Sequence, residues 1–458
     1  MTPEPAAADL DYHAALAALA DRGRFGIRLG LGRTRALLRA LGDPQLAVRG
    51  ALVAGTNGKG SVLAMAGSAL RAAGLRVGET PKPHLMSYRE RIVVDGLPIG
   101  AADFTRHVAA VLAVADGVAR RHGDPTEFEL LTAVVFRHFA ESSLDVALVE
   151  VGLGGRLDAT HAWDGGVAAV TNVDLDHMDR LGPTIAHIAR EKAAIIERGD
   201  LAVTGATGEA LTIIRRRARR LDVPLRVVEP APLLAQDRAG IEVELPRLGR
   251  TRVGLLGRHQ AANAAVADAL LDALDAAGIA AADDDARRRG YAAARWPGRL
   301  ELLPGPTGGD VLLDGAHNPA GAAALATALD ELRPMLTAGP VALLVAAMAD
   351  KDVDGVITAL RASAVVRAAR VVATSLPDLP RALPAAELAA RWRAGGADAV
   401  VAVDDPATAL DAARLTGQAD GLGVLVVAGS LYLVGAVRAR LVDDPALRDP
   451  PPHATMTS

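Results

Sequence analysis

The chain has 458 residues, a length that predicts two or three domains rather than one hydrophobic core. Half of the residues are apolar, 23% are charged and the net charge is -4, a balance that favours a globular protein and argues against a general nucleic-acid binder. The absence of cysteine excludes disulfides, a thiol nucleophile and zinc–thiolate sites.

The sequence shows no targeting or membrane segment. Residues 1–20 lack a basic segment followed by an apolar core, and no apolar stretch is long and unbroken enough to cross a membrane. We therefore expect a cytoplasmic enzyme that acts as a monomer on small molecules, with no nucleic-acid and no membrane partner.

The first forty residues predict two helices separated by a glycine-rich turn. Residues 1–9 resemble a loose tail, and residues 10–22 predict a helix. The segment 25–33 is rich in glycine and precedes a helix that runs to about residue 41. By itself, this turn predicts only the cap of a helix.

A glycine-rich loop, Gly-Thr-Asn-Gly-Lys-Gly-Ser, follows an apolar strand at residues 51–54 and precedes a helical pattern that stops at Gly74. The glycines let backbone N–H groups point at a phosphate, and the helix N-terminus adds partial positive charge. The alternative is an ordinary strand–helix turn, because the spacing departs from the usual P-loop pattern. We predict that this loop binds nucleotide phosphate through Gly55, Thr56, Asn57, Gly58, Lys59, Gly60 and Ser61.

Residues 75–79 predict a short strand that leads into a loop at residues 80–91. Two prolines flank Lys82 in this loop and argue against regular structure. Residues 103–122 predict a helix. Thr126 begins the next helix as an N-cap, with Glu129 three residues later at the spacing of a capping box.

A second buried strand, residues 145–151, carries Glu150 near its carboxyl end and runs into Gly-Leu-Gly-Gly-Arg-Leu-Asp-Ala-Thr. A carboxylate at the end of a parallel strand beside a phosphate loop is placed to bind the magnesium ion of a nucleotide. A third strand at residues 167–173 precedes His177 in an acidic loop, although a lone histidine is more often structural than a ligand. The next helix contains Lys192, and the simplest interpretation of its Arg-Glu-Lys run is a solvated face.

Residues 201–256 predict strand-like pieces and a basic surface helix. Residue 257 opens a long alanine-rich helix in which His259 and Asn263 share one face. We interpret residues 280–289 as an acidic-then-basic connection. The Trp-Pro-Gly-Arg segment at residues 296–299 indicates a domain junction.

Beyond the junction, strands alternate with helical patterns and predict a second open α/β unit of Rossmann type. The strands are expected at residues 311–313, 341–347, 370–374, 399–403 and 423–428. No Gly-x-Gly-x-x-Gly fingerprint is present, so NAD is not indicated. The proline-rich end, residues 443–458, predicts a disordered tail.

Taken together, these motifs resemble the folylpolyglutamate synthase/dihydrofolate synthase family, which belongs to the Mur-type ATP-dependent amide ligases. The resemblance covers residues 12–440 and is most specific in the nine residues that follow Glu150. It implies an α/β fold with a P-loop-containing, Mur-ligase-like ATP-binding domain at residues 1–297, which also holds the pterin site. A Rossmann-like C-terminal ligase domain is implied at residues 298–442.

The resemblance also implies the roles of individual residues. ATP would be bound by the loop and by Asn263, Arg299 and Asp314. Magnesium would be held by Glu150, His177 and a carbamate formed on Lys192, whose amine must be partly buried in order to be neutral when carbon dioxide adds. Catalysis would fall to Lys59, Lys192 and His317, and the pterin would contact Leu29, Gly30, Leu31, Thr126, Phe128, Glu129, Leu157, Asp158 and Ala159.

Two positions depart from the family. Gly32 stands where the family often has Glu, and Lys82 stands where a serine hydroxyl binds magnesium. A protonated ammonium has no lone pair for a metal. Lys82 is therefore expected either to point away or, as we favour, to occupy the metal's position and touch ATP phosphate; the alternative is an exposed lysine on a variable loop.

We predict an ATP-dependent ligase that joins L-glutamate to a pteroate or folate carboxylate through an acyl phosphate, with Mg²⁺ as its metal. Dihydrofolate synthase activity, folylpolyglutamate synthase activity or both agree with the sequence. The alternatives are a Mur-type ligase with another acceptor and a non-catalytic folate- or nucleotide-binding protein.

Overall fold

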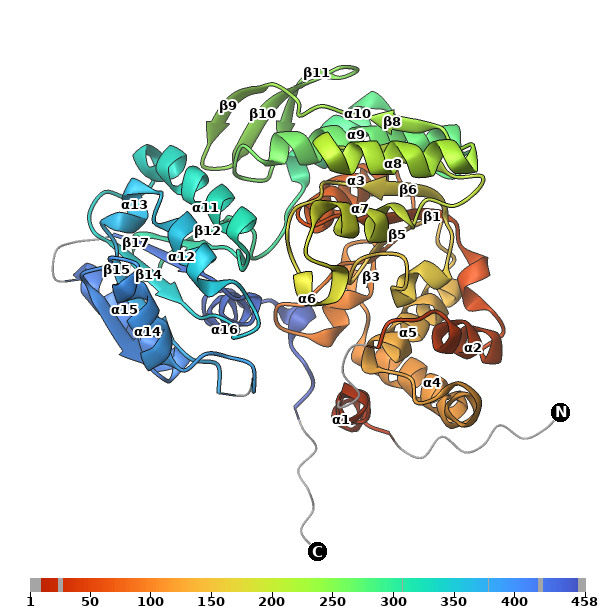
Figure 1. The fold of residues 1–458 in the computed structure, drawn as a ribbon, viewed down its shortest axis with the longest axis horizontal. Coiled ribbons are helices and arrows are strands. Elements are labelled where there is room, and N and C mark those ends of the chain that lie inside the picture. Colours follow the sequence, from red (N-terminus) through yellow and green to blue (C-terminus); the bar gives the residue numbers. More distant parts are fainter. Residues whose placement is uncertain (1–9, 24–27, 307, 378, 419–422, 452–458) are drawn as a thin grey trace, which may run out of the picture.

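The computed structural model describes residues 10–23, 28–306, 308–377, 379–418 and 423–451. The described chain forms two α/β domains that lie side by side, with a small three-stranded sheet above them (Figure 1). The tail expected at residues 1–9 and part of the turn at residues 25–33 lie outside the described residues.

The first domain is built on an eight-stranded sheet whose central strands are parallel. In spatial order its strands are β4 (Leu97–Pro98), β3 (Val93–Val94), β2 (Val77–Thr80), β5 (Val146–Glu150), β1 (Gly50–Ala54), β6 (Gly166–Val170), β7 (Leu201–Thr204) and β8 (Leu225–Val227). Strands β3 and β4 form an antiparallel edge. Apolar residues fill β1 completely, as expected for a strand covered on both faces.

Helices cover both faces of this sheet, because successive side chains of a strand point to opposite sides. Leu52 of β1 packs into one core and Val53 into the other. The first face is covered by α1 (Tyr12–Gly23), α2 (Gly32–Ala40), α4 (Ala101–His122), α5 (Glu127–Glu141), α7 (Ile185–Ala193) and α8 (Gly208–Leu221). The second face is covered by α3 (Lys59–Ala72), α9 (Gln260–Ala276) and α10 (Asp284–Ala293).

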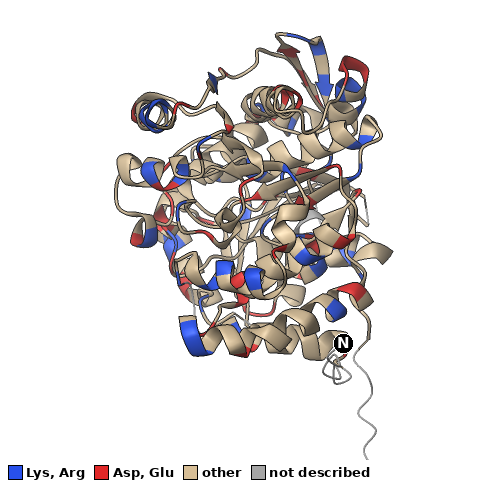
Figure 2. Cartoon of the chain, turned by 90° about the vertical axis from the view of Figure 1, so that its right-hand side faces the viewer, with Lys and Arg blue, Asp and Glu red and all other residues tan. Residues whose placement is uncertain are grey.

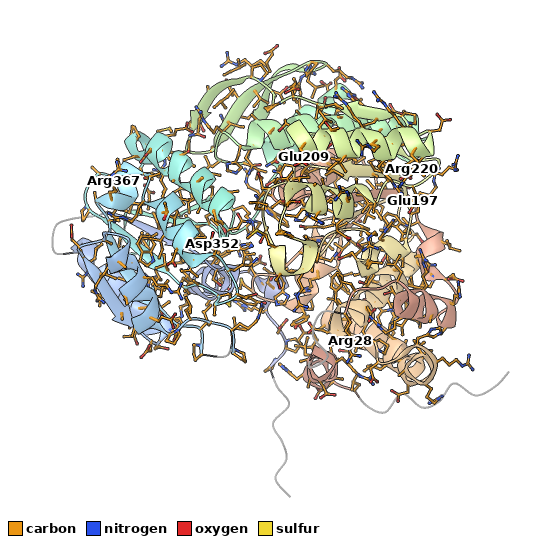
Figure 3. All side chains as sticks on the ribbon, viewed as in Figure 1. Arg28, Glu197, Glu209, Arg220, Asp352 and Arg367 are labelled. Atoms are coloured by element: carbon orange, nitrogen blue, oxygen red, sulfur yellow. The ribbon has the colours of Figure 1, made fainter. Side chains whose placement is uncertain are left out.

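The second domain has a six-stranded sheet, parallel apart from one antiparallel edge strand. Its order is β12 (Glu301–Pro304), β13 (Asp310–Leu313), β17 (Val424–Ala428), β14 (Val341–Val345), β15 (Arg370–Thr374) and β16 (Val400–Val403). One face packs on α11 (Pro319–Leu332), α12 (Val353–Leu360), α13 (Ala364–Arg367) and α14 (Ala385–Ala394), and the other on α15 (Pro406–Gln418) and α16 (Leu431–Leu441). Asp352, labelled in Figure 3, caps α12 by accepting a hydrogen bond from the amide of Gly355.

The small sheet comprises β9 (Leu233–Asp237), β10 (Gly240–Leu245) and β11 (Gly249–Val253). It contributes to the first domain's second core, and it also reaches the second domain. Both guanidinium NH2 groups of Arg238 donate to the carboxylate of Asp310, at 2.9 and 2.6 Å. This bidentate ion pair joins the small sheet, which packs on the first domain, to the second domain.

Short helical segments complete the fold. They are α6 (Met178–Leu181) and the 3₁₀ turns η1 (Pro44–Ala47), η2 (Tyr88–Arg91), η3 (Ala159–Ala162), η4 (Arg333–Met335) and η5 (Pro445–Leu447). The η2 turn lies in the loop where two prolines argue against regular structure. It forms because Ser87 and Glu90 make a capping box just beyond those prolines.

Two sequence expectations are wrong. The connection expected at residues 280–289 belongs largely to α10, whose N-cap Asp283 accepts from the amide of Ala286. The acidic residues suggested a linker, but they stabilise the N-terminus of a helix. The disordered tail expected at residues 443–458 is wrong for residues 443–451, which include η5 and pack on the first domain; residues 452–458 lie outside the described chain.

Charged residues are spread over the surface. Figure 2 shows both signs interspersed on the face in view, which agrees with the small net charge. The basic run expected on the surface lies in α8, between Glu209 and Arg220 in Figure 3, where Arg215 and Arg216 are exposed and Arg217 donates to the carbonyl of Ile196. In the described part of the chain, no helix has the length and apolar character needed to cross a bilayer.

Candidate functional site

The predicted site residues gather where the carboxyl ends of the two parallel sheets meet. Strand β1 leads into the glycine loop at residues 55–61, and β5 ends at Glu150. From the other domain, β13 leads into Asp314 and His317. Ligands of open α/β sheets bind in the crevice outside the carboxyl ends of the strands.

The glycine loop has the geometry of an anion site at the start of α3. Gly58 is the N-cap of α3 and has φ of 81°, a left-handed conformation that favours glycine. A Cβ at Gly60 would lie 2.3 Å from the Trp296 ring, which explains why glycine separates Lys59 from Ser61. Asn263 lies against the same loop, because a Cβ at Gly58 would be 2.2 Å from its side-chain oxygen.

The ammonium group of Lys59 folds back on its own loop. Its Nζ donates to the carbonyls of Gly55 at 3.0 Å and Thr56 at 3.2 Å, and it lies 3.8 Å from the Oε1 atom of Glu150. The cation is therefore held at the mouth of the loop beside a buried carboxylate. Burial raises the pKa of Glu150, and the nearby charges of Lys59 and Lys82 partly offset that rise.

Lys82 points into the site, so the interpretation as an exposed lysine is wrong. Its backbone amide donates to the Oε2 atom of Glu150 at 2.8 Å, and its Nζ donates to the carbonyl oxygen of Glu150. The ammonium also lies 5.4 Å from the centre of the Phe128 ring, within cation–π range. Burial lowers the pKa of Lys82 to about 8, although the charges of Asp158 and Glu150 oppose that change.

Lys192 is buried at the carboxyl end of α7 and is not on a solvated face. Its side chain donates to the carbonyl of Gly55 at 2.9 Å, which is the same oxygen that Lys59 contacts. Burial and the charge of Lys59 lower the pKa of Lys192 from its ordinary value of 10.5 to about 7. A substantial fraction of this amine is therefore neutral at physiological pH.

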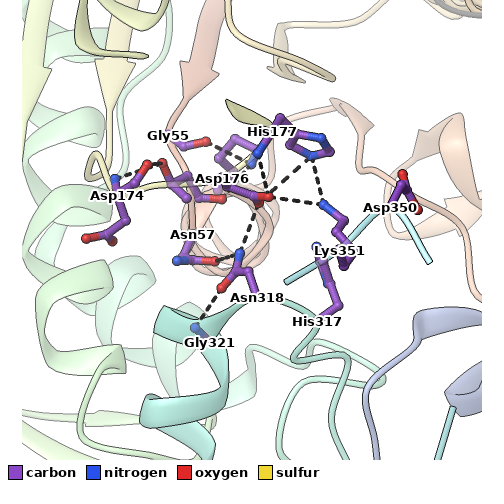
Figure 4. A network of polar contacts seen from close by, with 12 residues as sticks. Gly55, Asn57, Asp174, Asp176, His177, His317, Asn318, Gly321, Asp350 and Lys351 are labelled. Carbon is purple, nitrogen blue, oxygen red and sulfur yellow. Dashed lines mark hydrogen bonds and ion pairs between the residues drawn. The ribbon is translucent and has the colours of Figure 1, made fainter. Parts of the chain in front are cut away.

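His177 belongs to a network that joins the two domains (Figure 4). Asp176 accepts from Asn318 Nδ2 and from Lys351 Nζ, both at 3.0 Å, and Lys351 lies 3.4 Å from His177 Nε2. Burial would raise the pKa of Asp176, but the charges of His177 and Lys351 outweigh it and hold that pKa below its usual range. Burial lowers the pKa of His177.

Asp314 and Arg299 meet at the domain junction. Asp314 accepts from the amides of Leu300 at 2.9 Å and Ala316 at 2.8 Å, so its carboxylate fixes the chain that leaves the junction. Burial lowers the pKa of Arg299, and the charges of Asp314 and Glu150 oppose the change. The guanidinium itself donates to the carbonyl of Gly298 at 3.2 Å.

His317 is held as a neutral imidazole with a defined tautomer. Its Nδ1 atom lies 2.8 Å from the carbonyl of Gly315, so Nδ1 carries the proton and Nε2 is free to accept one. Burial lowers the pKa of His317 to about 4. It lines a small cavity of about 20 Å³ with Lys351, Met348 and Trp392.

Segments predicted to contact the pterin come together on the other side of Glu150. The amide of Gly30 donates to the carbonyl of Leu157 at 3.3 Å, so the segment 29–31 lies against the segment 157–159. A Cβ at Gly152 would lie 2.7 Å from the Phe128 ring and 3.1 Å from Asp158, so Gly152 brings the segment 126–129 close to the segment 157–159. Leu29 is 38% exposed, so an apolar surface faces outward beside these residues.

Two of these residues also have structural roles that use their carboxylates. The predicted capping box between Thr126 and Glu129 is confirmed. Both carboxylate oxygens of Glu129 also accept from the Nε–H of Arg33. Asp158 accepts from the amide of Leu153 and from Thr160. Ala159 is buried in the η3 turn that Asp158 caps.

The lysines of the chain identify the site in a way that the motifs do not. The sequence contains four lysines among its fifty basic residues, and the others are arginines. All four lie around the site where the carboxyl ends of the two sheets meet, and none is exposed: Lys59, Lys82, Lys192 and Lys351. An ammonium group is more compact than a guanidinium, and it loses its proton more readily when it is buried. The chain therefore has lysine at the site, where a compact cation or a neutral amine is useful, and arginine elsewhere.

Sequence analysis did not predict the roles of Asn318, Asp176 and Lys351. Asn318 directly precedes Pro319, the first residue of α11, and its side chain caps that helix by accepting from the amide of Gly321. The signal that would have found Lys351 is the rarity of lysine in the composition. The pairing of Asp176 with residues 142 and 175 positions away has no sequence signal.

The donors for a metal ion are only partly assembled. No cluster of three or more His, Cys, Asp or Glu side chains suited to a metal occurs among the residues for which the structure is described. Glu150 supplies a carboxylate and His177 an imidazole, and both donor types suit divalent cations. A third donor must come from another group.

Comparisons with known proteins agree with this geometry. The Mur ligase middle domain family matches residues 53–271, and the Mur ligase, glutamate ligase domain family matches residues 298–431. The dihydrofolate synthase/folylpolyglutamate synthase of Bacillus subtilis is 33% identical over 430 residues, which are 92% of this chain and 96% of the relative.

Solved structures match over nearly the whole chain. The folylpolyglutamate synthase of Mycobacterium tuberculosis complexed with ADP and AMPPCP has a TM-score of 0.84 at 34% identity, covering 95% of this chain and 100% of that one. The bifunctional folylpolyglutamate synthase/dihydrofolate synthase of Yersinia pestis complexed with AMPPNP and Mn ion has a TM-score of 0.78 at 31% identity, covering 96% and 100%.

The lowered lysine pKa values give the first prediction. We expect ¹³C-methylated protein in carbonate-free buffer to show one lysine signal that titrates near pH 7 and one near pH 8, each removed by Lys192→Arg or Lys82→Arg respectively. Unfolded lysine keeps its proton to about pH 10.5, so the folded state binds fewer protons above pH 7, and the contribution of Lys192 to the free energy of unfolding rises with pH across that window. Titration of the Lys82 and Lys192 signals near the ordinary lysine pKa of 10.5 would contradict the burial argument.

Proposed function

The chain belongs to the folylpolyglutamate synthase/dihydrofolate synthase family of Mur ligases, and from that premise we propose that it joins L-glutamate to a pteroate or folate carboxylate with ATP as the energy source. The convergence of four non-exposed lysines at the carboxyl ends of two facing sheets carries the proposal, because a polyanion is the substrate that such a cleft stabilises. The chemistry needs three reactants in one crevice, and both domains contribute to it.

Phosphoryl transfer comes first, because a carboxylate is a poor acyl donor until it becomes an acyl phosphate. ATP phosphates would rest on the amides of residues 55–61, with Lys59 neutralising the transferring group. Lys59 must leave the carbonyls of Gly55 and Thr56 to do so, which is a small movement for a flexible side chain. Asn263 would pair with adenine, and Arg299 and Asp314 would act from the junction.

Glu150, His177 and a carbamate on Lys192 would hold magnesium. The fit depends on Lys192: as an ammonium it repels a cation, whereas as a carbamate it supplies the third donor that the described cluster lacks. Its pKa of about 7 supports carbamate formation, since the neutral amine is the reactive form. The metal would supply charge neutralisation and orientation of the phosphates.

The amine of glutamate then attacks the acyl phosphate, and inorganic phosphate leaves. His317 would receive the amine's proton at Nε2, because its Nδ1 proton is fixed on Gly315 and its imidazole is neutral. Water would hydrolyse the acyl phosphate, so the cleft must close during the reaction. We propose that closure pivots at residues 296–299, the boundary between domains at 1–297 and 298–442.

The folate acceptor would occupy the side of Glu150 that holds the Phe128 ring. Leu29, Gly30, Leu31, Leu157 and Ala159 would form its apolar contacts, with Thr126, Glu129 and Asp158 holding the walls in place through their caps. The carboxylate to be activated would then face the glycine loop. We also propose that the enzyme is cytoplasmic and acts as a monomer.

Lys82 would replace the metal-binding serine of the family with a fixed positive charge. Its ammonium lies between the Phe128 ring and the main chain of Glu150, so it stands between the acceptor side and the nucleotide side of the cleft. From there it would touch ATP phosphate, in the position otherwise taken by a metal. Retention of lysine in a chain that otherwise uses arginine supports a role for its compact charge.

Release of phosphate tests the proposed function directly. Purified protein with ATP should release phosphate only when both L-glutamate and dihydropteroate or a reduced folate are present. Lys59→Ala should lower kcat by about 10²- to 10³-fold, because one preorganised contact to the transferring charge is lost. Exposed Arg215→Ala is the matched control and should change nothing. Release with a different carboxylate acceptor would indicate another Mur-type ligase, and nucleotide binding without turnover a non-catalytic homologue.

Lys192 should carry a carbamate in the active enzyme. A ¹³C-bicarbonate-dependent carbamate signal is expected in the wild type and not in Lys192→Ala, whose activity should be low and partly restored by a small carboxylate. Lys192→Arg keeps the charge but forms no stable carbamate, so it should be equally inactive. A wild-type rate that survives complete removal of bicarbonate would count against the assignment.

Exchange of Lys82 tests its replacement of a metal ligand. A unit charge about 4 Å from Mg²⁺ costs about 8 kcal/mol at an effective dielectric near 20, before anions offset it. Lys82→Ser should therefore raise the magnesium requirement by one ion, measured as the order of the rate in metal. Lys82→Ala should lower the rate more than Lys82→Ser. Unchanged magnesium dependence with near-wild-type rates in both variants would refute the role.

A further inference from the structure

The end of the chain returns from the second domain to the first. Helix α16 ends at Leu441, and residues 443–450, which we call the C-terminal strap, run down beside α1 (Figure 1). The carbonyl of Pro450 accepts from His13 Nε2 at 2.6 Å. The strap therefore links the last helix of one domain to the first helix of the other.

A single carboxylate oxygen anchors the strap. Asp449 Oδ1 accepts from Tyr12 OH at 2.8 Å, Ser87 Oγ at 2.7 Å and Arg89 Nε at 3.2 Å. Burial raises the pKa of Tyr12 to about 12, and the charge of Asp449 adds to that rise. The phenol therefore stays a donor at any physiological pH.

Arg89 makes this anchor electrostatic. Its side chain is 7% exposed, and its guanidinium also donates to the carbonyls of Ile99 at 3.2 Å and Arg448 at 2.7 Å. Asp449 is the carboxylate with which it forms an ion pair. A buried guanidinium without its carboxylate is strongly disfavoured, so the strap is held wherever Arg89 is buried.

The anchored residues belong to the loop that begins at Lys82, which we call the 82–91 loop. Glu90 accepts from the amides of Leu85, Met86 and Ser87 at 2.7 to 3.0 Å, so the loop moves as a unit. Its far side is pressed against α16, where a Cβ at Gly435 would lie 2.0 Å from the carbonyl oxygen of Leu85. Helix α16 and the strap therefore hold the loop from two sides.

The first residue of this loop is the one that reaches the reaction centre. The backbone amide and the Nζ of Lys82 both donate to Glu150. Contacts thus run from Asp449 through Ser87 and Glu90 to Leu85, and the main chain connects Leu85 to Lys82 three residues earlier. Displacement of the loop by 1 Å would move a charge that must be matched to phosphate.

We propose that Asp449 is a positioning residue: through Arg89 and Ser87 the strap fixes the 82–91 loop on α16, and so sets the place of Lys82 at Glu150. The catalytic part of this inference rests on the proposed ligase function. Because the strap leaves α16, its hold on the loop also ties the loop to the second domain.

Asp449→Asn is the discriminating variant, since it keeps an acceptor for Tyr12 and Ser87 but removes the charge that Arg89 needs. Asp443→Asn is the matched control, because that exposed strap carboxylate pairs only with the exposed Arg448 among the described contacts. Tyr12→Phe removes one anchor without a change of charge and serves if Asp449→Asn does not fold. Hydrogen exchange of the loop amides and the steady-state kcat and KM values are measured for each.

We expect the amides of Leu85, Met86 and Ser87 to exchange about tenfold faster in Asp449→Asn, with β5 unchanged, as for local opening of one segment. The kcat value should fall by about 10- to 100-fold while KM for ATP holds, since misplacement of a reacting charge acts on the transition state. Unchanged exchange in the loop, equal acceleration in both domains, or faster loop exchange with normal kcat would each overturn the proposal. The exchange measurement needs no turnover, so it decides the anchor even if the proposed ligase activity is wrong.

Discussion

Positive charge held out of water is the constraint on which the site depends. Four lysine side chains lie in one site, where Lys59 pairs with the carboxylate of Glu150 and Lys351 with that of Asp176. Burial lowers the pKa values of Lys82 and Lys192, which shows that the folded chain pays for this excess of cations. In the function that we propose, a polyphosphate or a carbamate would relieve that cost.

The same constraint explains why the domains meet as they do. Each sheet alone offers half a site at its carboxyl edge, and Asn318 and Lys351 of the second domain add to the stabilisation that His177 gives the Asp176 carboxylate. At the rim, Arg238 and Asp310 hold the domains without occupying the cleft. Nearer the centre, Asp176 makes its polar contacts with the second domain, and Leu85 packs against an apolar core of that domain.

The sequence predicted regular elements well where local rules dominate. The five parallel strands of the second domain, the strand before the glycine loop and the capping box of α5 follow from apolar runs and cap residues, which act over a few positions, whereas the antiparallel edge strand β12 was not predicted. The helix at Asp284 was missed because its acidic first turn looks like a linker until the chain is seen to pack on α3. The ordered strap was not predicted because a segment rich in proline and aspartate indicates disorder. Its order depends on Arg89, which lies far away in the sequence and pairs with Asp449.

Local patterns in the sequence were enough to predict the fold class and the family, and they point to the glycine loop that we propose receives phosphate, because glycine spacing, apolar strands and ordered motifs are local properties of the chain. Only the tertiary structure decided which way Lys82 points, that Lys192 and Lys59 share the carbonyl of Gly55, and that Asp449 closes on Arg89 from 360 residues away. Desolvation is the physical reason. The protonation and the contacts of an ionisable side chain depend on the groups that surround it in the folded chain, and no local sequence pattern shows which distant groups will shield it from water.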